Sequence, residues 1–343
     1  MAAPRLSREL TTAIGHSDPR TTKAICGHLF PIRQPDRRED GRVPRAWRSR
    51  SQAQVALKLE QKDPKTSVTF VHLACSGASI IDHNRPHSGA GGGLLDPYVG
   101  INPGAVLPAQ VDEAKRLIGN RVPDAILLSA GVNDLDFGEV VKSCARLDVY
   151  VNPKQETDCF GKPYTDTTGT THQTLLAFLQ ERFKLLPDLY TRLGDELATI
   201  APPDRVFITN YPDTLHNDNG ELCARLNLTA PAGLTVTDQA PVAITRVAVI
   251  LSLVTKVLLP LNTAIDNGYK QWNVVKLTGT DFRDHGYCAG NRWIVTRNES
   301  FQNQGNDNGT LHPNKAGHDA IAVVVYPVVE AQLYPGGKAR PPQ

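Results

Sequence analysis

One short stretch near the middle of the chain constrains its fold more than any other. Residues Ala125–Leu128 are apolar without polar alternation, which is typical of a strand buried on both faces of a parallel sheet. The run stops after Ser129, and Gly131-Val-Asn133-Asp134 follows at the carboxyl end of the predicted strand. Ligands of open α/β sheets lie just beyond that end. Asn133 is therefore either a donor to a developing oxyanion or, together with Asp134, a cap of the next helix.

The remaining chain alternates predicted strands with predicted helices. We expect strands at 67–74, 125–128, 205–210 and 273–277, with a short one at 10–15. Helices are expected at 51–60, 108–118, 137–145, 173–200 with a break at Pro187, 242–264 and 315–329. This alternation predicts an α/β fold, in which a parallel sheet carries helices on both faces.

Length and composition favour one large domain. The chain has 343 residues, of which 40% are hydrophobic, enough for a sizeable core. We predict a domain at 51–335, preceded by a poorly defined segment at 1–50 and followed by a flexible tail at 336–343. The net charge of +2 is too balanced for a nucleic-acid surface, and the Arg-rich stretch at 37–50 is expected to be a solvated linker.

Neither a signal peptide nor a membrane span is expected. The first ten residues carry Arg5, Arg8 and Glu9 without an apolar segment behind them. The longest apolar run, 242–264, contains Arg246 and Lys256 and is broken by Pro260. Its apolar residues recur at helical spacing, so we expect a buried helix.

The chain has six cysteines and no Cys-x-x-Cys pair, which argues against a zinc site. An even number in loops fits disulfides formed in an oxidising compartment. Cys144 and Cys159 bracket a short polar segment and are the first expected pair, worth about 3 kcal/mol by chain entropy. Cys223 and Cys288 are the second. The expected disulfides conflict with the expected lack of a signal peptide. A truncated or misassigned start of the sequence would resolve this conflict.

Four short motifs lie at predicted strand ends or in the tail: Ser76-Gly77, Gly131–Asp134, Asn210–Asp213 and His312-Pro313-Asn314. In this order they resemble the SGNH (GDSL-type) hydrolase family. The resemblance covers roughly residues 50–330. It implies a three-layer, flavodoxin-like fold with a sheet of about five parallel strands, and ester hydrolysis without a cofactor or metal. The run from Phe282 to Ile294 looks like the tail of the secreted, disulfide-bearing bacterial branch, which implies a secreted or periplasmic protein.

The resemblance also implies roles for individual residues. Asn133 and the backbone of Gly77 would form the oxyanion hole, and His312 would be the general base that activates a serine. The family often has an aspartate three residues before this histidine, where the chain has Gly309. Asp307 or a main-chain carbonyl would orient the imidazole instead.

The nucleophile is the open question. Ser76 follows a strand and precedes Gly77, but the helix at 51–60 looks like the crossover between the first two strands of the family. The nucleophile would then lie upstream of residue 50, where Ile14-Gly-His-Ser17 resembles a Gly-Asp-Ser motif with histidine in place of aspartate. Ser17, Ser76 and the loss of the nucleophile all remain open. The family's partner for Cys75 is also missing, which leaves Cys26 or none.

The sequence therefore predicts a monomeric serine esterase or lipase acting on a small-molecule or lipid ester. Two alternatives share the same residues. The first is a catalytically silent protein of this fold that binds an acyl or glycan ligand. The second is an O-acyltransferase.

Overall fold

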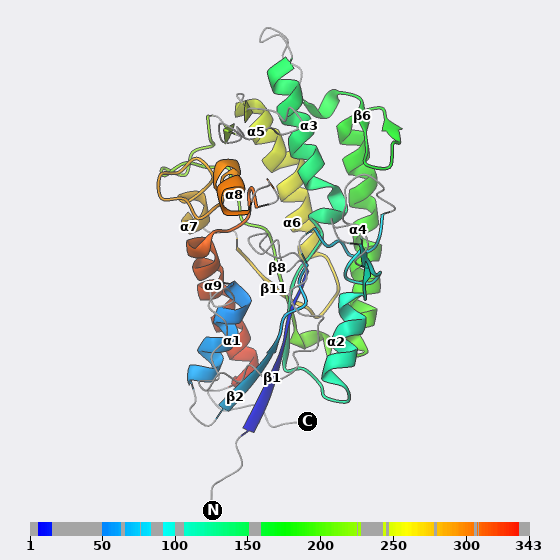
Figure 1. The fold of residues 1–343 in the computed structure, drawn as a ribbon, viewed down its shortest axis with the longest axis vertical. Coiled ribbons are helices and arrows are strands. Elements are labelled where there is room, and N and C mark those ends of the chain that lie inside the picture. The colour runs from blue at the N-terminus through cyan, green and yellow to red at the C-terminus, as the bar shows by residue number, and fades with distance from the viewer. Residues whose placement is uncertain are drawn as a thin grey trace, which may run out of the picture.

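A computed structural model gives the three-dimensional structure of the chain (Figure 1). It describes residues 6–15, 50–62, 66–75, 77–83, 92–99, 106–150, 159–224, 226–227, 243–244, 247–277, 280–304, 307 and 309–335. Within these ranges, five strands form one sheet in the order β11-β8-β5-β1-β2, and every neighbouring pair is parallel. They are β1 (Leu6–Gly15), β2 (Thr66–Val71), β5 (Ala125–Ser129), β8 (Val206–Thr209) and β11 (Asn273–Val275).

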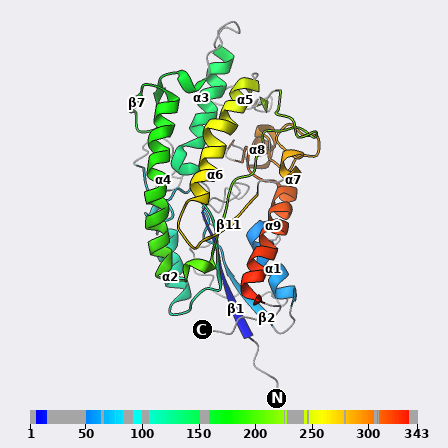
Figure 2. The same cartoon turned by 180° about the vertical axis from the view of Figure 1, so that it is seen from behind.

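Helices cover both faces of this sheet. The helices of the described residues are α1 (Ser51–Lys62), α2 (Gln110–Ile118), α3 (Phe137–Tyr150), α4 (Leu175–Ala198), α5 (Val247–Leu253), α6 (Leu259–Asp266), α7 (Thr280–Arg283), α8 (Arg297–Gln304) and α9 (Lys315–Leu333). Both views place α1 and α9 side by side on one face and α2 and α4 on the other (Figures 1 and 2). Two-stranded ribbons decorate this core: β3 (Tyr98–Val99) with β4 (Val106–Leu107), β6 (Tyr164–Thr165) with β7 (Thr171–His172), and β9 (Leu226–Asn227) with β10 (Ala243–Ile244). The predicted three-layer α/β architecture is confirmed.

The apolar run of β5 shows why the sheet is buried on both sides. Ala125 and Leu127 pack in the core beneath α1 and α9, while Ile126 and Leu128 pack in the larger core on the opposite face. All four side chains are at most 3% exposed. Side chains alternate between faces along a strand, so a sheet with helices on both sides requires apolar residues at consecutive positions.

Residues 6–15 of the N-terminal segment form strand β1 of the sheet. Strand β1 lies between β2 and β5, with Leu10 opposite both Phe70 and Ala125. The short strand expected at 10–15 is therefore confirmed and starts earlier, at Leu6. Its sequence, LSRELTTAIG, is too polar to indicate that the strand is central. Helix α1 is the crossover from β1 to β2, as the family resemblance implied.

The predicted helix break at Pro187 is wrong, because α4 continues through this residue. Leu186, Leu189, Tyr190 and Leu193 lie around the proline and are all buried. An interior proline costs about 3 kcal/mol, whereas each large apolar side chain contributes roughly 1.5–3 kcal/mol on burial. Packing of this face therefore outweighs the lost backbone hydrogen bond.

The apolar segment near residue 250 forms α5, a π-helical turn at Val254–Leu258, and α6. By length and composition alone, the stretch Val247–Asp266 is able to cross a membrane, with a mean hydropathy of 1.8. Core helices pass the same test, and 44% of this window is buried. Ile250, Val257 and Leu261 pack into the main core, in agreement with the predicted buried helix. The predicted start at 242 is wrong, because Ala243–Ile244 form β10 and α5 begins at Val247.

Candidate functional site

The turn after β5 places Asn133 and Asp134 against the loop that follows β2. Gly131 has a φ of 115°, a conformation open to glycine and strained for other residues, and the short 3₁₀ helix Asn133–Leu135 begins beyond it. The Asn133 amide donates to the carbonyl of Ala78 at 2.8 Å. The Asp134 carboxylate accepts from the backbone N–H of Ile80 at 3.0 Å. Both side chains thus bind the loop, and neither contact is a helix cap.

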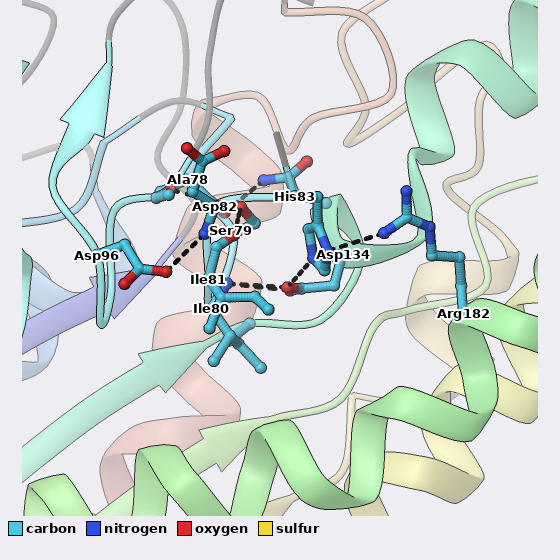
Figure 3. Close-up of polar contacts among 12 residues, drawn as sticks. Ala78, Ser79, Ile80, Ile81, Asp82, His83, Asp96, Asp134 and Arg182 are labelled. Carbon is cyan, nitrogen blue, oxygen red and sulfur yellow. Dashed lines mark hydrogen bonds and ion pairs between the residues drawn. The ribbon is translucent and has the colours of Figure 1, made fainter. Parts of the chain in front are cut away.

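The loop that they hold carries Gly77, the expected backbone donor. Gly77 has a φ of 77°, which again favours glycine. Asp134 is 1% exposed and also contacts Nε2 of His83 at 2.9 Å, while Nδ1 of His83 contacts Arg182 at 2.8 Å (Figure 3). Neither His83 nor Arg182 has a role expected from the sequence. They lie 51 and 48 residues from Asp134, and no local pattern connects them.

His312 lies in a tight turn that leads into α9. Its carbonyl accepts from the N–H of Val295 at 2.8 Å, and Leu311 before it has a φ of 65°. The side chain of Asn314 caps α9 by accepting from Gly317 N–H at 3.1 Å, and its own amide donates to Arg292 O at 2.8 Å. These bonds explain the His-Pro-Asn motif, because the asparagine anchors the turn that presents the histidine.

A main-chain carbonyl contacts the His312 imidazole. Nδ1 lies 3.1 Å from the carbonyl oxygen of Thr310. Because a carbonyl only accepts, Nδ1 carries a proton in this contact, and Nε2 is the nitrogen that accepts a proton when the ring is neutral. Asp307 instead pairs with Arg297 at 3.6 Å. Of the two orienting groups suggested by the sequence, this geometry favours the main chain over Asp307.

An apolar cavity of about 190 Å³ adjoins His312 at the carboxyl ends of β5 and β8. Val132 and Tyr211 line it near Asn133, and side chains of the α5–α6 segment line another side, namely Leu253, Val257, Leu258 and Leu261. His312 and the neighbour of Asn133 therefore face one apolar space. An apolar cavity with a few polar lining groups suits a ligand with an apolar chain and a polar head.

Tyr211 supports the same end of the cavity. Its backbone is held at both polar groups by the buried Asn262, whose Oδ1 accepts from Tyr211 N–H at 2.9 Å and whose Nδ2 donates to Tyr211 O at 2.8 Å. Burial raises the pKa of the Tyr211 phenol to about 12. The phenol is therefore neutral at physiological pH. The Asn210–Asp213 motif seen in the sequence thus becomes a fixed wall of the cavity.

Both candidate nucleophiles, Ser17 and Ser76, lie outside the described residues, as does Cys26. Strand β1 ends at Gly15, which pairs with Ser129 at the end of β5, two residues before Ser17 in sequence. The roles of these serines therefore remain predictions. Among the described residues, no group of three or more His, Cys, Asp or Glu side chains has the arrangement of a metal site.

Two disulfides join described cysteines, and both are pairs expected from the sequence. Cys144–Cys159 ties α3 to the short 3₁₀ helix Cys159–Gly161, and Cys223–Cys288 closes a separation of 65 residues. Cys75 is also disulfide-bonded. Disulfides are consistent with an oxidising compartment.

No protein-family model matches the chain, and no curated protein does. Among solved structures, an extracellular lipase from Streptomyces rimosus is 15% identical with a TM-score of 0.45, over 95% of this chain and 99% of the lipase. A phospholipase A1 from Streptomyces albidoflavus is 14% identical with a TM-score of 0.43, over 94% and 98%. A family two carbohydrate esterase from Clostridium thermocellum is 13% identical with a TM-score of 0.34, over 95% and 64%.

Proposed function

We propose that the protein is a serine ester hydrolase that acts on esters of apolar acyl chains. The observation that carries this proposal is the shared cavity, which His312 lines together with Val132, the neighbour of Asn133. Acyl transfer from an ester requires a base whose Nε2 can accept a proton and an amide donor at a strand end.

In the proposed reaction, the hydroxyl of Ser17, or alternatively Ser76, attacks the ester carbonyl carbon. Its proton passes to Nε2 of His312, and the negative charge on the carbonyl oxygen is held by Asn133 and Gly77. The intermediate collapses, and the departing alcohol takes the proton from Nε2. Water then attacks the acyl-serine and gives a proton to Nε2. Release of the acid returns that proton to the serine.

The hydrogen bond from Nδ1 to Thr310 O takes the place of the carboxylate in a Ser-His-Asp triad. A carbonyl fixes the tautomer and the ring orientation as a carboxylate does. It carries no full charge and stabilises the imidazolium less. The chemistry therefore requires the main-chain turn at 309–312 to be rigid, and the hydrogen bonds between Leu311 N–H and Val295 O at 3.0 Å and between Val295 N–H and His312 O supply that rigidity.

The proposal is tested by hydrolysis of p-nitrophenyl acetate, butyrate and octanoate. We compare wild type with Ser17→Ala, Ser76→Ala and His312→Ala, and use His172→Ala, on the β6–β7 ribbon, as the control. Loss of a general base lowers kcat by roughly 10²–10⁴-fold, and only one of the two serine variants is expected to show a similar loss. Thermal unfolding of each variant separates loss of chemistry from loss of fold.

The outcomes discriminate between the functions considered. Hydrolysis that survives His312→Ala refutes the serine mechanism. A wild-type protein that binds an acyl ester without turnover supports the silent binding protein instead. Transfer of the acyl group to an added sugar at the expense of hydrolysis supports the acyltransferase. The disulfides favour a secreted or periplasmic setting for any of these.

A further inference from the structure

We propose that His83 and Arg182 are positioning residues that act through Asp134. They hold the loop Gly77–Ile80, which carries the proposed backbone donor to the oxyanion and is called the oxyanion loop below. This inference rests on the proposed hydrolase function. It concerns a chain of three side chains from separate parts of the fold: Asp134 after β5, His83 after the loop that follows β2, and Arg182 on α4 (Figure 3).

The protonation of this chain follows from its contacts. The Arg182 guanidinium lies 2.8 Å from Nδ1 of His83 and can only donate, so Nδ1 accepts. The ring proton is then on Nε2, which donates to Oδ1 of Asp134 at 2.9 Å. His83 is therefore a neutral bridge between a guanidinium and a carboxylate, and the three groups together carry no net charge.

Burial explains why such a bridge is needed. The side chains of His83 and Asp134 are only 4% and 1% exposed. A buried carboxylate is costly unless charge and hydrogen bonds compensate it. Arg182 supplies the compensating charge across the imidazole, and its guanidinium lies over the ring of Phe178, 5.1 Å from the ring centroid. The aromatic ring holds the Arg182 guanidinium in place beside His83.

The chain acts on the site because Asp134 and Asn133 are consecutive and hold the same loop. Asp134 binds the N–H of Ile80, with its oxygens at 3.0 and 3.2 Å, and Asn133 binds the carbonyl of Ala78 at 2.8 Å. Gly77, the proposed backbone donor, belongs to this loop. Without the hydrogen bond from His83, the Asp134 carboxylate rotates toward other donors. This rotation shifts both the loop and the Asn133 amide. Misplacement by about 1 Å costs up to roughly 10²-fold in rate.

Kinetics of ester hydrolysis test the role of each residue. We compare wild type with His83→Ala, Arg182→Leu and the conservative His83→Gln, whose amide offers both a donor and an acceptor. His172→Ala is the matched control, because it removes another histidine that is paired with a carboxylate, Asp166, at 3.1 Å. We expect kcat to fall roughly 10- to 100-fold in His83→Ala with KM changed less than about threefold, because orientation and not substrate binding is lost.

The remaining variants give the expected order of effects. Arg182→Leu should lower kcat less than His83→Ala, His83→Gln should recover part of the loss, and His172→Ala should stay within about twofold of wild type. A kcat of His83→Ala equal to that of wild type overturns the proposal. So does an equal fall in the His172→Ala control. If His83→Ala does not fold, His83→Gln and Arg182→Leu carry the same test.

A second measurement keeps this inference separate from the proposed function. Hydrogen exchange of the Ile80 amide reports whether Asp134 still holds the loop and needs no substrate. We expect exchange at least about tenfold faster in His83→Ala and unchanged exchange in His172→Ala. A wild type without ester hydrolysis removes the proposed function, while faster exchange at Ile80 still supports the positioning chain. Unchanged exchange in His83→Ala refutes it.

Discussion

Substituting Gly131 by alanine should destabilise the protein more than any ordinary glycine substitution in the same region. Gly131 has a φ of 115°, which side chains rarely tolerate and which costs about 1–3 kcal/mol for a residue with a Cβ. An alanine Cβ would also overlap the Tyr190 hydroxyl and come within 3.2 Å of Leu261 Cδ1. Overpacking of a close-packed core costs about another 1–3 kcal/mol. We therefore expect a loss of about 4 kcal/mol in the free energy of unfolding.

The overlap involves a hydroxyl that has its own structural role. Tyr190 is completely buried and donates to the carbonyl of Ala130 at 3.1 Å. It cannot move aside without breaking that bond. The strain would also displace Asn133, two residues further on, so Gly131→Ala should lower any hydrolytic activity together with stability.

Urea denaturation measures this effect, and the chain offers a matched control. Gly138 lies in α3, seven residues away, and an added Cβ there meets nothing within 4 Å. Gly138→Ala should raise stability by up to about 1 kcal/mol, because alanine favours a helix. Tyr190→Phe alone should cost about 1 kcal/mol for the lost hydrogen bond.

The double variant Gly131→Ala/Tyr190→Phe separates the two causes. Removing the hydroxyl relieves the overlap but not the backbone strain, so the double variant should lose at least about 1 kcal/mol less than the single losses combined. If the losses are additive, the steric argument is wrong. If Gly131→Ala unfolds at the same urea concentration as Gly138→Ala, the whole reasoning fails.

Three further outcomes follow from the structure. Burial raises the pKa of Glu299, but hydrogen bonds from Arg292 and Thr296 outweigh it and lower that pKa below the unfolded value of 4.5. The ionised Glu299 therefore stabilises the fold above the unfolded pKa, and this stabilisation is lost as pH falls through the lower folded pKa. The stability difference between wild type and Glu299→Gln, about 1 kcal/mol after allowance for exposure, should therefore shrink in acid denaturation below that pH; a constant difference argues against it. Val257→Phe should shorten the apolar cavity and lower kcat/KM for octanoate relative to acetate by at least about tenfold, since each buried methylene contributes roughly 0.8 kcal/mol; an unchanged ratio places the acyl chain elsewhere. Replacing both Cys223 and Cys288 by serine should lower the free energy of unfolding by about 4 kcal/mol on the chain-entropy estimate, and a loss below 1 kcal/mol in urea denaturation contradicts it.

Local sequence was sufficient for the elements whose burial is periodic or continuous. The apolar run before Ser129 predicted a doubly buried strand because the alternating faces of β5 both meet helices. The His312-Pro-Asn314 motif predicted the start of α9, and Asn314 caps that helix. In these cases the residue types that favour an element lie within a few positions of one another, so the chain expresses the preference locally.

In strand β1 and helix α4, tertiary contacts decide the structure where the local sequence signal is weak or unfavourable. The polar sequence of β1 forms a central strand because β2 and β5 both offer it hydrogen-bonding partners. Pro187 stays inside α4 because the side chains around it are buried. Tertiary contacts compensated for a weak strand signal in one case and overrode a helix breaker in the other.

The candidate site divides in the same way. The sequence by itself determined that Asn133 and Asp134 follow a buried strand and that His312 opens the last helix, since strand ends and helix starts are local properties. Only the tertiary structure decided that Asn133 binds Ala78 rather than capping a helix, and that Thr310 O contacts His312 while Asp307 pairs with Arg297. It alone joined Asp134 to His83 and Arg182. These partners are chosen by how the sheet and helices close around the site, and hydrogen-bond geometry between distant segments leaves no periodic trace in the chain.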